Sequence, residues 1–82
     1  MKKSFEKLMA QLNGRIPQNV LEFLPIVLSP QMKNDLTEEA PEKVAAAVMF
    51  AIESINRGSV EKVEVLIRKH LTEQSRGYGH DL

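Results

Sequence analysis

Cysteine and tryptophan are both absent from this 82-residue chain, and its aromatic side chains are three phenylalanines and one tyrosine. Without cysteine, the chain has no disulfides, thiolate metal ligands or cysteine nucleophiles. With so few aromatic residues, the core must be largely aliphatic. A chain this short buries only roughly 60–65% of its unfolded surface, less than a larger domain does, and oligomerisation is a common way to stabilise such a fold.

An excess of charge of either sign is also absent, because eleven basic residues balance eleven acidic ones. This balance argues against nucleic-acid binding driven by global charge, although a local basic patch is compatible with it. Glu6 and Lys7 stand where a signal peptide would be apolar. No apolar run approaches the roughly 20 residues that span a bilayer. We therefore expect a soluble cytoplasmic protein with one domain over residues 1–75 and a flexible tail over 76–82.

The N-terminal part of the chain predicts short helices. Apolar residues at helical spacing favour a helix over residues 3–13, which Asn13 and Gly14 would end. A second helix should begin near Pro17 and kink or end near Leu24, because Pro25 interrupts its pattern. Residues 25–36 are either helical or irregular, and Ser29 is a candidate N-cap for a piece that ends near Leu36.

Residues 44–52 are nine consecutive apolar residues, which would cover every side of a helix. Thr37 is the expected N-cap of this helix, followed by three acidic residues that favour a helix N-terminus, and Gly58 should follow its end at Arg57. Ser59 is then expected to cap a further helix at once, in which Glu64 and Arg68 form an i,i+4 pair.

A turn of about two residues between these last helices predicts an antiparallel helical hairpin over about 38–74. The expected fold is all-α, a small four- or five-helix bundle built on this hairpin.

The apolar run of residues 44–52 is either wrapped by residues 5–12, 20–28 and 60–71 of the same chain or forms the interface of a homodimer. Because prolines break the second wrapping segment, we expect a dimer. The expected dimer or partner interface is Val44, Ala45, Ala47, Val48, Met49, Phe50, Ala51, Ile52 and Ile55. The candidate polar partner contacts are Lys62, Arg68, Lys69 and Arg76.

Residues that could carry catalysis or bind a metal are few. His70 lies beside an apolar stripe, and His80 precedes Asp81 in the tail, but no third group converges on either histidine in sequence. The acids near residue 40 are explained by the helix dipole without a metal ion. Phosphate-binding loops and nucleophile elbows have no counterpart in the sequence. We expect a non-enzymatic protein without catalytic residues, metal or cofactor.

Residues 58–66, Gly-Ser-Val-Glu-Lys-Val-Glu-Val-Leu, resemble the stretch around the phosphopantetheine-bearing serine of acyl carrier proteins. The resemblance implies that Ser59 would carry the prosthetic group, although the family's aspartate is Gly58 here. The alternative interpretation of Ser59 is a helix N-cap.

Two further functions are compatible with a small helical domain. A DNA-binding regulator would use residues 60–74 as a recognition helix, but Glu61 and Glu64 would repel phosphates at its start. Alternatively, a dimer would present the basic residues within 68–76, among them Arg68 and Lys69, to the phosphate backbone. A regulator or adaptor that acts by protein–protein contact requires only a helical face that covers a partner's surface. We expect the latter, as a homodimer with an unidentified protein partner, and keep the DNA-binding regulator as the alternative.

Overall fold

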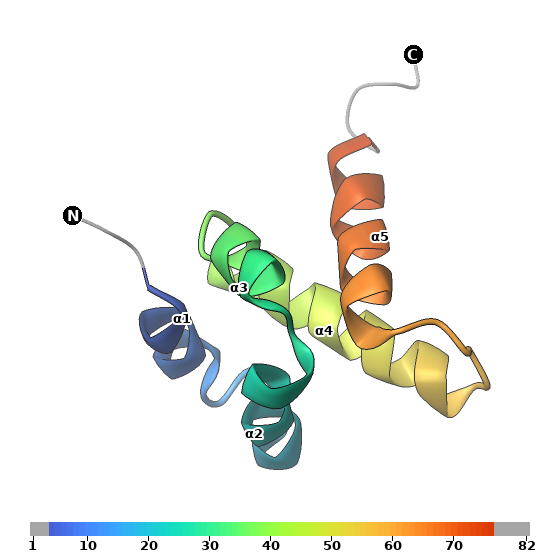
Figure 1. Ribbon diagram of the computed structural model, residues 1–82, viewed down its shortest axis with the longest axis horizontal. Helices are drawn as coiled ribbons and strands as arrows, with labels where there is room; N and C mark the ends of the chain where they lie inside the picture. The colour runs from blue at the N-terminus through green and yellow to red at the C-terminus, as the bar shows by residue number, and fades with distance from the viewer. Residues whose placement is uncertain (1–3, 77–82) are drawn as a thin grey trace.

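The computed structural model describes residues 4–76, with the side chains of residues 75 and 76 excepted. These residues form five α-helices and no β-strand (Figure 1), which confirms the all-α class. The helices are α1 (Phe5–Leu12), α2 (Gln18–Val27), α3 (Pro30–Leu36), α4 (Pro41–Asn56) and α5 (Val63–Arg76). Residues 77–82 of the predicted tail lie outside the described residues. Within the described part, no helix is long and apolar enough to cross a membrane.

The first helix begins and ends as its sequence predicts, within two residues. The hydroxyl of Ser4 accepts a hydrogen bond of 3.1 Å from the backbone N–H of Lys7, which caps the N-terminus of α1. Asn13 is the C-cap, and Gly14 follows with a φ of +90°. A residue with a Cβ adopts this left-handed conformation at a cost, so glycine suits the turn into α2.

Of the two outcomes expected at Pro25, a kink or an end of α2 near Leu24, the end is not found, because α2 continues to Val27 with Pro25 inside it. A proline at this position lacks the N–H that would bond to the carbonyl of Leu21, and its ring crowds that carbonyl. The backbone N–H of Leu28 still bonds to the carbonyl of Leu24 at 3.1 Å, so the last turn is kept.

The alternative left open for residues 25–36 is resolved as helical, except for Leu28 and Ser29, which join α2 to α3. Ser29 caps α3 as predicted, because its hydroxyl accepts a bond of 3.2 Å from the backbone N–H of Met32. Pro30 occupies the first turn, where its missing N–H has no intrahelical partner to lose.

Thr37 does not cap α4, contrary to the prediction. It is the C-cap of α3, and its hydroxyl donates a hydrogen bond of 2.6 Å to the carbonyl of Asn34. The N-cap of α4 is Ala40, without a side-chain bond, and Pro41 stands in the first turn. Proline fixes a helical φ and pushes the preceding residue into extended backbone. The proline therefore determines where α4 begins.

A glycine follows the C-cap residue of α4, as predicted. Gly58 has a φ of +107°, and its N–H bonds to the carbonyl of Ile55 at 2.9 Å. The N–H of Ser59 bonds to the carbonyl of Ser54 at 2.9 Å. This pair of bonds is a Schellman motif, which satisfies carbonyls that the helix leaves free.

The connection to α5 is longer than the two residues predicted. Residues 57–62, called the hinge below, separate Asn56 from Val63, so Ser59 does not cap α5. Its hydroxyl instead accepts a bond of 3.2 Å from the backbone N–H of Glu61, inside the hinge. A connection of this length does not require antiparallel alignment, and Figure 1 shows α5 crossing α4 steeply, near its middle.

One apolar cluster forms the core, and every helix contributes to it. Its fully covered members include Leu12 from α1, Leu24 from α2 and Ile67 from α5. The helix pair with the most extensive contact is α4 with α5, while α1 contacts both α3 and α4. In Figure 1, α4 runs behind the other helices and joins the α1–α3 side of the molecule to α5.

Candidate interaction surface

The apolar run of α4 lies mostly inside the chain's own core. Five of the nine side chains expected at an interface are buried there: Val44, Ala45, Ala47, Val48 and Ala51. Met49, Phe50 and Ile52 are partly buried and pack against the core, and Ile55 is exposed. The helices of the same chain that cover α4 are chiefly α5 and, to a lesser extent, α1, so this wrapping is more complete than the prolines in the sequence suggest.

The aromatic ring of Phe50 packs on His70 of α5, with 5.0 Å between the ring centroids and 30° between the ring planes. The Nε2 atom of His70 is buried and has no hydrogen-bond partner in the described residues. Phe50 thus contacts the chain's own α5, and Ile55 is the one exposed member of the expected interface.

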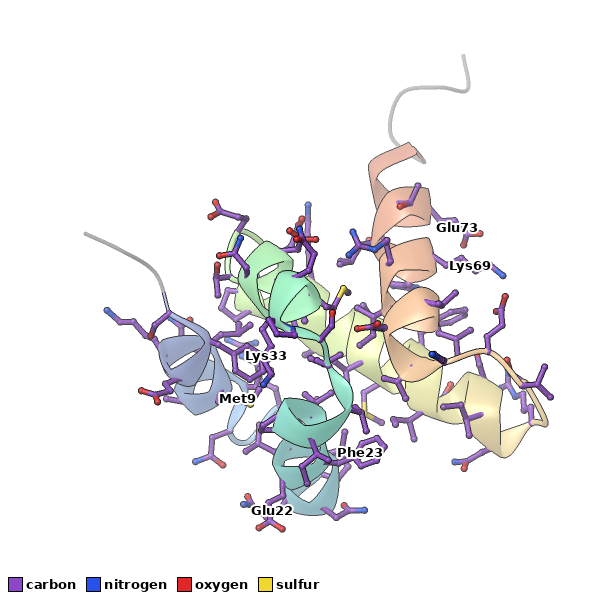
Figure 2. All side chains as sticks on the ribbon, viewed as in Figure 1. Met9, Glu22, Phe23, Lys33, Lys69 and Glu73 are labelled. Carbon is purple, nitrogen blue, oxygen red and sulfur yellow. The ribbon has the colours of Figure 1, made fainter. Side chains whose placement is uncertain are left out.

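Large apolar side chains are exposed on three helices and in the hinge. They are Phe23 (39%), Ile26 (81%), Ile55 (37%), Val60 (97%) and Val65 (45%). Phe23, Pro25 and Ile26 are all exposed within the C-terminal half of α2, and we call these three residues the α2 surface. In Figure 2, Phe23 projects from α2 toward the side of the molecule where the C-terminal half of α4 lies. Closely spaced exposed apolar residues are typical of a binding surface.

The carboxylate of Glu64 on α5 connects α5 to the N-terminus of α3. Its Oε1 accepts a hydrogen bond of 3.0 Å from the backbone N–H of Ser29. The backbone and side chain of Ser29, and then nearby Lys62 and Arg68, hold the pKa of Glu64 below its ordinary value, against the opposing effect of desolvation. In a capping box, the residue three places into the helix binds the N-cap N–H. Met32 occupies that place, and Glu64 supplies the carboxylate from another helix.

Arg68 makes a second connection between α5 and α3. Its Nη2 donates to Oδ2 of Asp35 at 2.9 Å and lies 3.2 Å from the sulfur of Met32. The i,i+4 pair predicted between Glu64 and Arg68 is therefore replaced by contacts with α3. Neither connection has a signal in the sequence, because the partners lie more than 30 positions apart.

The other candidate polar contacts are more dispersed. Nζ of Lys69 lies 3.5 Å from Oε1 of Glu61, so this lysine also has an acidic partner. Lys62 is exposed in the hinge, and the side chain of Arg76 lies outside the described ones. The structure does not bring these candidates together into one basic patch in the part of the chain that it describes.

Two shallow grooves flank the molecule. One, of about 480 Å³, follows the outer face of α5 beside Ser29 and includes Val65, Lys69 and Glu73. Figure 2 shows Lys69 and Glu73 projecting from the same side of α5. The other, of about 500 Å³, lies between α1 and the start of α4. No group of three or more acidic or histidine side chains among residues 4–76 is placed to hold a metal ion.

Comparison with protein-family models, with curated proteins and with solved structures returned no match for this chain.

Proposed function

We propose that this protein is a small non-enzymatic regulator or adaptor that acts by protein–protein contact, as a homodimer. The observation that carries the proposal is the α2 surface, where Phe23, Pro25 and Ile26 are exposed within one turn of the helix. An exposed phenylalanine beside a branched aliphatic side chain is the kind of anchor that fills a pocket on a partner. The mechanism is occlusion, in which this helical face covers a partner's surface.

The charge pattern favours this proposal over DNA binding. Arg68 and Lys69, the described basic residues expected to touch phosphate, both pair with acidic side chains of the same chain. Binding a phosphate backbone would require these pairs to break.

The carrier-protein alternative places the prosthetic group on Ser59, which lies in the hinge, four residues before α5 begins. Mass spectrometry after incubation with a phosphopantetheinyl transferase tests that alternative directly.

The experiment that tests the proposed surface compares two variants by affinity capture from the native cell. Ile26→Glu places a charge on the α2 surface, and Ala46→Glu places the same charge on an exposed position of α4. Both variants should keep the helical circular dichroism spectrum of the wild type. We expect I26E to lose a protein that the wild type and A46E both retain. Equal retention by all three would contradict the assignment of α2 as the contact surface.

A further inference from the structure

We propose that two copies of the chain dimerise by exchanging α5, so that α5 of each copy docks on α4 and α3 of the other. This inference rests on the proposed homodimer and specifies which surfaces it uses. In the structure, the apolar run of α4 is mostly buried under helices of its own chain. After the exchange, α5 of the second copy would cover this run, which would then be an interface between chains.

The position of α5 permits the exchange. It is the last helix of the described chain and is joined to the rest only through the hinge, whose residues are all exposed except the half-buried Ser59. An open six-residue segment reaches up to about 20 Å, whereas the axes of packed helices lie 8–10 Å apart. An open hinge can therefore hold α5 clear of its own chain's α4.

The docking contacts of α5 would be kept unchanged in the exchanged dimer. Val63, Leu66 and Ile67 would fill the same core. The polar connections to Ser29 and Asp35 of α3 would form between chains instead of within one. Domain exchange reuses native contacts in this way and is a low-cost route to a dimer.

Two features of the hinge permit its opening. Its hydrogen bonds are backbone bonds to the end of α4 and the start of α5, the bond to the Ser59 hydroxyl and the Glu61–Lys69 pair, so among the described residues opening breaks no hydrogen bond to α1, α2 or α3. Val60 is 97% exposed, so the closed hinge gives this apolar side chain no contact. In an exchanged dimer the two open hinges lie near each other, where the Val60 side chains of the two copies gain a partner.

Interchain crosslinking distinguishes exchange from simple association. The chain has no native cysteine, so single cysteines can be placed without background. Chains carrying Asp35→Cys are unfolded and refolded with an equal amount of chains carrying Arg68→Cys, then treated with a short bis-maleimide. The native pair is an exposed salt bridge, whose loss costs little stability. Helical circular dichroism verifies that the mixture is folded.

We expect covalent heterodimers in this mixture, because Asp35 of one copy lies against Arg68 of the other after exchange. A mixture of D35C and Ala46→Cys chains measures chance collisions, since Ala46 is an exposed position on α4. If the protein is a dimer but the D35C and R68C mixture crosslinks no more than the D35C and A46C mixture, the exchange of α5 is contradicted and the homodimer is not. A chain that sediments only as a monomer would contradict both the exchange of α5 and the proposed homodimer.

A matched pair of glycine variants tests the hinge itself. Gly58→Ala and Gly14→Ala each place a Cβ where φ is positive and where no neighbouring atom lies within 4 Å. A left-handed alanine is unfavourable, so G58A should shift the hinge toward the open form by roughly 5- to 30-fold per chain. We expect G58A to increase the dimer fraction and G14A, with similar strain outside the hinge, to leave it unchanged. Equal dimer fractions in both variants would contradict the role of the hinge.

Discussion

Glu64 on α5 accepts a hydrogen bond of 3.0 Å from the backbone N–H of Ser29, the N-cap of α3, across 35 positions of sequence. Ser29 thus caps α3 with its hydroxyl while its own N–H binds a carboxylate from another helix. One residue therefore links the local end of α3 to the docking of α5. If α5 is exchanged between chains, the same bond joins the two copies.

Glu64→Gln should make the stability of the protein less sensitive to acid. The pKa of Glu64 is lower in the folded chain than its ordinary value of 4.5, chiefly because of its hydrogen bonds to Ser29. The folded state therefore binds this proton less readily, and the contribution of Glu64 is fully present above pH 4.5. It is lost as pH falls below that value. Urea unfolding at several pH values should show a smaller acid loss for E64Q than for the wild type, and equal losses would contradict the assigned bond.

Ser29→Ala should lower the free energy of unfolding by about 1 kcal/mol, because it removes the N-cap of α3. Ser59→Ala is the matched control. The hydroxyl of Ser59 binds only the N–H of Glu61 inside the exposed hinge, and α5 begins later, so its loss should change stability by less than about 0.5 kcal/mol. Chemical denaturation measures both variants. An equal cost at the two serines would indicate that Ser59 caps a helix after all.

Ala47→Leu should destabilise the protein by about 1–3 kcal/mol, since Ala47 is fully buried and a leucine there overpacks the core. The neighbouring Ala46 is exposed, and Ala46→Leu should change the free energy of unfolding by less than about 0.5 kcal/mol. Thermal or urea unfolding at fixed protein concentration checks the pair. Similar effects at both positions would mean that the two alanines do not differ in burial as described.

DNA binding should be absent. Arg68 and Lys69, the basic residues of α5 whose side chains are described, are already paired with acidic residues of the same chain. We expect no change in the mobility of duplex DNA at about 50 mM salt, where phosphate contacts are strong. A shift that weakens steeply as salt is added would support the DNA-binding alternative instead.

Much of the helical content was predictable, because apolar spacing and capping residues act over a few positions. Ser29 and Gly58 both act as their sequence context predicts. The start of α4 was misplaced at Thr37, although Pro41 carries a usable signal, since proline prefers the first turn. Pro25 is a misleading signal for a helix end, because α2 continues to Val27 and keeps the hydrogen bond from Leu28 to Leu24.

The arrangement of the interaction surfaces was much less predictable. Burial of Ala47 and exposure of Ile26 depend on how the helices pack, which a single helix period does not determine. The contacts of Glu64 and Arg68 with α3 join distant parts of the chain. Within a helix, these two residues suit an i,i+4 pair equally well, and only the tertiary fold provides the competing partners.

Sedimentation equilibrium of the wild-type chain tests the central claim, homodimerisation, most directly. The chain has a mass of 9.3 kDa, and we predict a concentration-dependent mass that approaches twice this value. The measurement should extend to high micromolar concentration, since a dimer formed by exchange competes with the closed monomer. A mass that stays at 9.3 kDa throughout would contradict the claim.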